Sequence, residues 1–168
     1  MDFPFKFADR DRMTNILLTG SSRGIGAAIR TQLESRPEQD GISVIGHASK
    51  AYDGATIGAD LSDVSAAKSL WDEALDRSSG QLDILINNAG LFEAVALDDS
   101  DEAWLASWQR TLQINLTAAA ELSRFAVRHW QQRGVPGRIV HIASRAGHRG
   151  DSPAHWHYAA AKGGMLAM

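Results

Sequence analysis

The chain has 168 residues, of which 44% are apolar and 22% charged, with a formal net charge of −3 and no cysteine. This length and composition predict one globular domain with a sizeable core, and they argue against nucleic acid or an anionic membrane as the main partner. The lack of cysteine excludes disulfides, thiol catalysis and cysteine-ligated metals. No apolar run reaches roughly 18 residues, and the N-terminus shows no signal-peptide core, so a cytoplasmic location is expected.

The first twelve residues mix phenylalanines with charged residues and show no clear period. Met13 leads directly into the first predicted strand. The preceding residues are therefore either an added arm, with Met13 as the true start, or a segment that lies on the domain surface. We divide the chain into an N-terminal arm over residues 1–12 and a domain over residues 13–168.

A glycine-rich stretch follows the first apolar run, residues 15–18, and an apolar-periodic segment begins at Ile25. This pattern predicts a buried strand, a tight turn and a helix start. Gly20, Gly24 and Gly26 have the spacing GxxxGxG, which is close to the dinucleotide fingerprint GxGxxG but differs from it. Glycines at a helix start leave backbone N–H groups open to a phosphate. On its own, this stretch is either a cofactor loop or an ordinary strand–helix turn.

Strands and helices alternate along the rest of the chain. Residues 25–36 predict a helix that ends before a proline, and the stretch 60–63 is expected to cap a second helix that runs to residue 78. A long helical region is predicted over residues 101–133 and another helix from His155. Further strands are predicted over residues 41–47, 56–59, 83–87 and 138–144. Only eight residues separate the second strand from the third, so no full helix is expected there.

This alternation predicts an α/β fold, a doubly wound parallel sheet in the order 3-2-1-4-5 with helices on both faces. Ligands of such sheets bind beyond the carboxyl ends of the strands. The glycine-rich stretch, Asp60, residues 88–90 and Ser144 all follow predicted strand ends. We therefore expect them to meet at one edge of the sheet and to form a binding site.

Tyr158 and Lys162 stand four residues apart, so a helix places them on one face. A free tyrosine has a pKa of about 10, and a neighbouring ammonium favours the phenolate and brings that pKa toward the working range. A bare YxxxK pattern is more typical of a surface tyrosine beside a solvated lysine. Ser144, which closes a strand before the loop that leads to Tyr158, favours an acid–base site instead.

Together these features resemble the short-chain dehydrogenase/reductase family, in its compact NAD(P)-dependent oxidoreductase branch. The resemblance runs from residue 15 to the end of the chain and rests on Thr19-Gly20-Ser21-Ser22-Arg23-Gly24-Ile25-Gly26, Asn87-Asn88-Ala89-Gly90, Asn115, Ser144 and Tyr158-xxx-Lys162. It implies a Rossmann-type fold and hydride transfer that interconverts a carbonyl and a secondary alcohol of a small-molecule substrate.

The resemblance also implies roles for individual residues. Tyr158 would be the general acid/base, and Lys162 would lower its pKa and hold the cofactor ribose. Ser144 would hydrogen-bond the substrate oxygen, and Asn115 would anchor a water of the proton relay. Ser144 as a loop cap, Asn115 as a partner of backbone groups in a helix kink and Asp60 as a simple helix cap stay open as alternatives. The cofactor-binding residues would be Gly20, Ser21, Ser22, Arg23, Gly24, Ile25, Gly26, His47, Asp60, Leu61, Asn88, Ala89, Gly90, Tyr158 and Lys162.

The end of the second strand indicates the cofactor. An acidic residue there would bind the ribose 2′-hydroxyl of NAD, but this place holds His47-Ala48-Ser49-Lys50, and Arg23 lies in the glycine-rich stretch. Positive and hydroxyl groups suit a 2′-phosphate, so NADP is expected, with NAD as the alternative. Lys50 as a merely solvated side chain also stays open.

Three histidines near the loop before Tyr158 raise the question of a metal. His148, His155 and His157 have no matching carboxylate pattern, so we expect structural or substrate-contact roles and no metal site.

Family members continue past the YxxxK helix with two further strands and a mobile substrate loop, which this sequence lacks. We therefore expect either a fragment of a longer protein, which we favour, or a naturally shortened relative. Two function classes follow: an oxidoreductase, or a non-catalytic nucleotide-binding or interaction module. For the full-length form the resemblance implies a homo-oligomer, a dimer or tetramer, that pairs through residues 101–133 and the helix after Tyr158.

Overall fold

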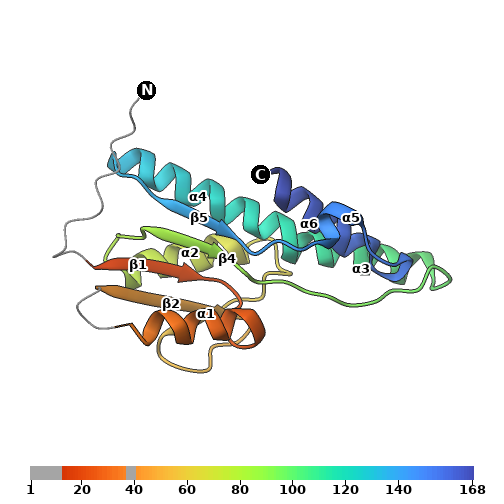
Figure 1. Cartoon of the computed structure of the whole chain (residues 1–168), viewed down its shortest axis with the longest axis horizontal. Helices are drawn as coiled ribbons and strands as arrows, with labels where there is room; N and C mark the ends of the chain where they lie inside the picture. The colour runs from red at the N-terminus through yellow and green to blue at the C-terminus, as the bar shows by residue number, and fades with distance from the viewer. Residues whose placement is uncertain (1–12, 37–40) are drawn as a thin grey trace.

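The computed structural model describes residues 13–36 and 41–168, so the predicted arm over residues 1–12 lies outside the described residues. The strands are β1 (Thr14–Leu18), β2 (Ile42–Ala48), β3 (Thr56–Gly58), β4 (Ile84–Asn87) and β5 (Arg138–His141). They pair in parallel in the order β3-β2-β1-β4-β5, which confirms the predicted sheet. Figure 1 shows this sheet with helices on either side of it.

Helical segments follow every strand except β2. They are α1 (Gly24–Glu34), α2 (Ala66–Arg77), α3 (Asp101–Leu112), the π-helix η2 (Gln113–Thr117), α4 (Ala118–Arg133), α5 (Ala146–Arg149), the 3₁₀-helix η3 (Pro153–His155) and α6 (Trp156–Ala167). In Figure 1, α3 and α4 follow one another as a long helical run, as the sequence predicts for residues 101–133. Within residues 13–36 and 41–168, the helices are too short or too polar to cross a membrane.

The side chains of each strand alternate between the two faces of the sheet. Leu17 of β1 is fully buried on one face with Leu70 of α2 and Leu122 of α4. Its neighbour Leu18 is fully buried on the other face, where Ile29 of α1 packs. This packing fixes the strands side by side, so that their carboxyl ends point to one edge of the domain.

The connection between β2 and β3 contains no helix, as its length predicts. It is held to α1 by Arg30, whose guanidinium forms an ion pair with Asp53 at 3.0 Å and hydrogen bonds to the hydroxyls of Tyr52 at 2.7 Å and Thr56 at 2.9 Å. One long side chain on α1 therefore replaces the packing that a crossover helix would provide.

The helix predicted from residue 60 begins later, at Ala66. Asp60 and Asp63 do not cap it: their carboxylates accept backbone N–H groups two residues on, from Ser62 at 3.0 Å and Ser65 at 2.8 Å. These bonds close two successive Asx turns, and those from Ser62 lower the pKa of the Asp60 carboxyl. The prediction that residues 60–63 cap the helix is wrong.

Candidate functional site

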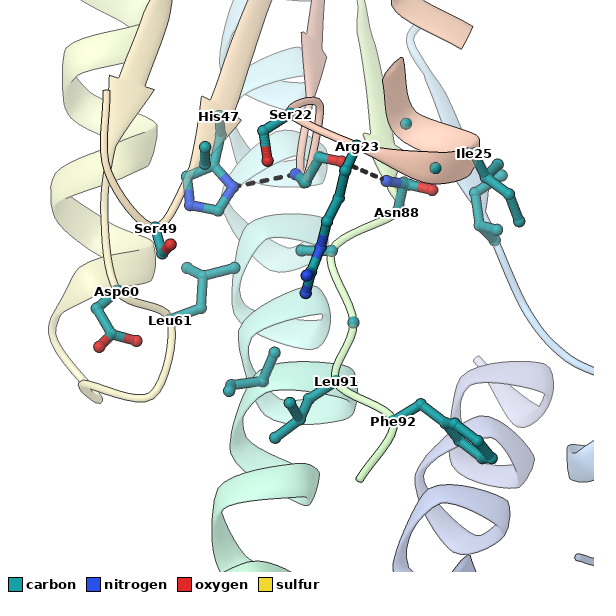
Figure 2. A pocket seen from close by; sticks show the side chains of 18 of the residues that line it. Ser22, Arg23, Ile25, His47, Ser49, Asp60, Leu61, Asn88, Leu91 and Phe92 are labelled. Carbon is teal, nitrogen blue, oxygen red and sulfur yellow. Dashed lines mark hydrogen bonds between the residues drawn. The ribbon is translucent and has the colours of Figure 1, made fainter. Parts of the chain in front are cut away.

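A cleft of 830 Å³ opens at the carboxyl edge of the sheet. The segments that follow β1, β2, β3, β4 and β5 all contribute to its wall, together with α3, η2 and α6. Figure 2 shows His47, Ser49 and Asp60 near one end of the cleft and Phe92 near the other. The wall thus brings together residues that lie far apart in the sequence, at the place where a doubly wound sheet binds ligands.

Most of the predicted site residues line this cleft. They are Gly20, residues 22–26, His47, Asp60, Leu61, residues 88–90, Tyr158 and Lys162. Ser21, Asn115 and Ser144 lie outside the lining. Sequence reasoning missed several members of the wall, namely Ala59, Leu91, Phe92, Arg110, Ile114, Ile142 and Ala143. One signal could have found two of these, because Arg110 and Ile114 stand four residues apart on a helical segment, next to Asn115.

The glycine loop requires glycine at two positions. Gly20 has φ +66°, and a Cβ added there would come within 2.7 Å of the Ala89 Cα. A Cβ on Gly26, in the first turn of α1, would lie 2.0 Å from the Gly20 carbonyl oxygen and 2.4 Å from Nδ2 of Asn88. These close approaches leave room between the loop, the start of α1 and the segment after β4 for the Asn88 amide but not for a Cβ on Gly20 or Gly26.

Asn88 holds this arrangement with its side-chain amide. Its Nδ2 donates to the carbonyl oxygens of Thr19 and Gly20, both at 2.9 Å, and the second of these bonds is drawn in Figure 2. The Thr19 hydroxyl in turn accepts the backbone N–H groups of Asn88 at 3.0 Å and Ala89 at 2.9 Å. Asn88 therefore directs its amide into the glycine loop and ties the ends of β1 and β4 together.

The start of α1 is suited to an anion. Arg23, the residue before its first turn, has an extended backbone and no capping side-chain bond, and the first turn has no acidic residue. A Cβ on Gly24 would meet no atom within 4 Å, so the space in front of the turn is open. Uncapped N–H groups and the positive end of the helix dipole both favour a phosphate here. The loop thus fits the pyrophosphate of a dinucleotide.

His47 lies beneath the glycine loop and is 3% exposed. Its Nδ1 accepts the backbone N–H of Gly20 at 3.2 Å, and its Nε2 lies 2.9 Å from the carbonyl oxygen of Ala59. Since a carbonyl can only accept, Nε2 carries the proton and the ring is neutral. Burial lowers the pKa of His47, which also favours the neutral ring.

Tyr158 and Lys162 reach the cleft from α6, on one face of that helix. The Lys162 Nζ lies 5.9 Å from the centre of the Tyr158 ring. Lys162 is 3% exposed, and its ammonium donates to the carbonyl oxygen of Ile142 at 2.7 Å. Burial lowers the pKa of Lys162, because a neutral carbonyl compensates its lost hydration only in part. The cleft thus contains a phenol close to a desolvated cation.

Asn115 lies at the centre of the π-helix and is fully buried. Its Oδ1 accepts the backbone N–H of Leu91 at 2.6 Å, and its Nδ2 donates to the carbonyl oxygen of Leu91 at 2.8 Å. Both polar groups of the amide therefore bond to one residue of the segment after β4. Asn115 thus bonds to backbone groups, as one of the alternatives from the sequence expects. These groups belong to Leu91 in the cleft wall and not to the helix that carries Asn115.

Ser144 lies between β5 and α5, in a region predicted as strand to residue 144; β5 ends earlier, at His141. The Ser144 Oγ accepts the backbone N–H of Ala146 at 3.2 Å, which caps the turn that leads into α5. An oxygen that accepts this bond keeps its own proton to donate. Ser144 therefore combines the loop-capping role with a hydroxyl proton that it can donate.

An aromatic cluster lies at the end of the cleft where α6 begins. The ring of Phe92 stacks on His155, with centres 4.2 Å apart and planes 7° apart, and meets Tyr158 edge-on at 4.8 Å. The Nε2 of His157 lies 3.2 Å from the Ser107 hydroxyl. Phe92 is nevertheless 59% exposed. Ring contacts thus hold an exposed aromatic side chain beside Tyr158, and two of the three histidines have structural contacts.

The profile of the family described as short chain dehydrogenase matches residues 14–168. The chain is 34% identical to 3-oxoacyl-[acyl-carrier-protein] reductase FabG of Haemophilus influenzae, over 90% of this chain and 63% of that protein. It is 32% identical to 3beta-hydroxysteroid dehydrogenase 1 of Eggerthella lenta, over 77% of this chain and 52% of that protein.

A comparison with solved structures also finds a dehydrogenase with a similar fold. This structure, 4-hydroxyisoleucine dehydrogenase complexed with NADH, superposes with a TM-score of 0.74 at 28% identity, over 92% of this chain and 65% of that one. The chain thus spans less than two thirds of the length of each of these three relatives.

Proposed function

This chain belongs to the short-chain dehydrogenase family, and from that premise we propose that it carries the cofactor site and the acid–base residues of an NAD(P)-dependent oxidoreductase that interconverts a carbonyl and a secondary alcohol. One observation carries this proposal: Tyr158 and Lys162 reach, from one helix, the same cleft as the uncapped glycine loop. An acid–base pair and a phosphate-binding loop in one cavity suit a reaction between a dinucleotide and a small molecule.

The dinucleotide would be held along the whole cleft. The N–H groups at the start of α1 would bind its pyrophosphate, Asp60 and Leu61 would flank its adenine, and Lys162 would hold a ribose. When bound, the nicotinamide supplies or accepts the hydride. Glycine positions and the amide of Asn88 keep the loop in the shape that this binding needs.

Side chains of this chain would transfer the proton to or from the substrate oxygen. We assign Tyr158 as the group that exchanges a proton with the substrate oxygen, because this residue lines the cleft and a buried ammonium lies 5.9 Å from the centre of its ring. Ser144 would donate a hydrogen bond to the same oxygen. Asn115 would contribute through Leu91, because its two bonds fix the wall segment that follows β4. The water-anchoring role of Asn115 stays a prediction.

NADP is proposed over NAD from the residues around the end of β2. Ser49 and Lys50 are exposed in the cleft wall, and Arg23 extends into the same cleft from the glycine loop, as Figure 2 shows for Arg23. Ala48 stands where β2 ends, so that place carries no carboxylate. The solved relative holds NADH, so the preference for NADP rests on this chain's own residues.

Lys50→Ala tests the preference. We expect NADPH to bind about tenfold more weakly, since a hydrogen bond to a charged group contributes about 1.5–3 kcal/mol, and NADH to bind as before. The measurement is a titration of each nucleotide by fluorescence. Lys68→Ala, the same change at an exposed position of α2, should alter neither affinity. Equal losses for both nucleotides in Lys50→Ala would contradict a 2′-phosphate contact, and tighter binding of NADH to the unaltered chain would overturn the choice of NADP.

Phe92 is proposed as part of the substrate wall, because an exposed ring beside Tyr158 can contact the body of the molecule whose oxygen Tyr158 protonates. Phe92→Ala should lower kcat/KM by about tenfold, chiefly through KM, because apolar contact contributes about 1.5–3 kcal/mol per side chain. Phe92→Tyr, which keeps the ring, should stay within about threefold of the parent protein, since such contacts scale with the apolar area retained. Steady-state kinetics of the whole protein measure both, and an unchanged KM in Phe92→Ala would remove Phe92 from the substrate wall.

One pair of experiments separates the proposed oxidoreductase from a non-catalytic nucleotide-binding module. Nucleotide titration of this chain tests the cofactor site, and turnover of carbonyl substrates by the whole protein tests the chemistry. Binding together with turnover supports the enzyme, whereas binding without turnover in the whole protein favours the module. The homo-oligomeric state and the cytoplasmic location expected from the sequence stay predictions.

A further inference from the structure

The side chain of His47 joins the glycine loop to the segment after β3. Its two ring nitrogens bond to the backbone of Gly20 and Ala59, which lie 27 residues before it and 12 after it. Its own carbonyl oxygen accepts the N–H of Ser21 at 2.8 Å and the Ser21 hydroxyl at 3.2 Å. His47 therefore contacts the backbone on both sides of the cleft where the adenine end of a dinucleotide would lie.

These contacts need the neutral ring. Gly20 offers an N–H, so the Nδ1 of His47 must be an unprotonated acceptor. A second proton on the ring would place an N–H against an N–H, remove the bond to Gly20 and bury a positive charge. Gly20 has little freedom to move away, because it lies directly against Ala89 and Gly26. Protonation of His47 would therefore disturb the first residue of the loop that is suited to phosphate.

We propose that His47 is a positioning residue: its neutral ring holds the glycine loop in the shape that binds a dinucleotide, so that dinucleotide affinity falls when the ring is protonated. This inference rests on the proposed cofactor site. It concerns a residue that would not itself bond to the cofactor, because the ring is 3% exposed and both nitrogens are engaged by the backbone.

The charged groups around His47 come from four segments. Arg23 belongs to the glycine loop, Lys50 follows β2, Asp60 follows β3, and Arg30 of α1 reaches the connection before β3 through Tyr52 and Asp53. The lowered pKa of His47 comes from burial, against which only the Ala59 carbonyl acts. Since the folded ring takes up its proton at lower pH than a free histidine, the effect on affinity should appear below about pH 6.5.

The test measures the dissociation constant of NAD⁺ for this chain by calorimetry between pH 8 and pH 5, with circular dichroism at each pH to verify that the fold is intact. NAD⁺ is chosen because it lacks the 2′-phosphate, which itself titrates near a pKa of about 6. We expect a constant affinity above about pH 6.5 and, below it, a loss that approaches tenfold per pH unit, as the uptake of one proton dictates.

His47→Asn should remove this pH dependence, because an amide oxygen can accept the Gly20 N–H but cannot be protonated in this range. His47→Gln keeps a donor toward Ala59 and should bind NAD⁺ more weakly at every pH, again without a slope. His129→Asn is the control and should keep the slope of the parent protein, since His129 lies on α4, outside the cleft, where its ring meets Trp71 of α2 edge-on.

If neither His47 variant folds, NMR of the unaltered chain provides the measurement, since NAD⁺ should then lower the pH at which the His47 ring titrates. A slope that persists in His47→Asn, or a parent affinity that is constant from pH 8 to pH 5, would overturn the role of His47 alone. An affinity that rises on acidification would also overturn it, because the ring would then act as a cation toward phosphate. No binding of either NAD⁺ or NADPH at any pH would overturn the cofactor site itself and this inference with it.

Discussion

Tyr158→Phe is expected to lower turnover by the whole protein at least a hundredfold while leaving folding and cofactor binding almost unchanged. The substitution removes the hydroxyl that would exchange a proton with the substrate oxygen, and general acid–base catalysis contributes about 10²–10⁴ in rate. The aromatic ring stays, and with it the edge-on contact to Phe92 at 4.8 Å and the position of the Lys162 ammonium 5.9 Å from the ring centre. The measurements are kcat with a reducible carbonyl substrate, nucleotide titration and thermal unfolding.

The second tyrosine provides a matched control for this experiment. The Tyr52 hydroxyl accepts a hydrogen bond from the Arg30 guanidinium at 2.7 Å and donates one to the Ser21 carbonyl oxygen at 3.5 Å, and Tyr52 belongs to the connection between β2 and β3. Tyr52→Phe should therefore lower the free energy of unfolding and leave kcat within about twofold, because each of these two hydrogen bonds contributes about 0.5–1.5 kcal/mol to folding and neither involves α6. Near-normal turnover in Tyr158→Phe would show that the proton donor lies elsewhere and that the central assignment is wrong.

The strand order was predictable because it depends on features that can be recognised in the amino-acid sequence alone. Apolar runs alternate with amphipathic segments, and right-handed crossovers leave few ways to place such strands in a sheet. The length of the connection from β2 to β3 alone ruled out a helix there. What length could not predict is the use of Arg30, which reaches Asp53 and Thr56 across more than twenty residues of sequence.

The start of α2 could not be predicted correctly because the residue types before it are compatible with two local structures. Aspartate and serine are favoured both at helix caps and in Asx turns, because in both places the side chain accepts a nearby backbone N–H. The prediction therefore began this helix at residue 60 instead of Ala66. The role of Asn115 in the π-helix was not predictable for a different reason. Nothing in the local sequence reveals that its amide will pair with Leu91, 24 residues earlier.

The candidate site was predictable where a residue carries recognisable chemistry and unpredictable where its role comes from long-range contacts. The glycines, Tyr158 and Lys162 stand out in the sequence, and the structure places them in one cleft. Phe92 carries no such signature, because an apolar residue after a strand end is common. His47 was predicted as a cofactor contact from its place in the chain, whereas its bonds to Gly20 and Ala59 depend on the folded sheet.

Gly26→Ala is expected to weaken dinucleotide binding at least tenfold and to lower the free energy of unfolding by about 1–3 kcal/mol, the usual cost of an overpacked buried site. The added Cβ would lie 2.0 Å from the Gly20 carbonyl oxygen and 2.4 Å from the Asn88 Nδ2. The first of these atoms belongs to the backbone and cannot rotate away, so Gly20 or α1 must move. Either movement opens the loop at the place where the pyrophosphate would bind.

Gly54→Ala is the control for Gly26→Ala, because it makes the same change at an exposed glycine whose added Cβ would meet no atom within 4 Å and whose φ is not positive. It should leave nucleotide affinity unchanged and the stability unchanged or slightly higher, since alanine restricts the unfolded chain. Urea unfolding and NADPH titration of both variants measure the difference. If Gly26→Ala bound NADPH within about twofold of the unaltered chain, the contact of Gly26 with Gly20 would not shape the phosphate site, because the movement that relieves a Cβ–oxygen separation of 2.0 Å would have left binding intact.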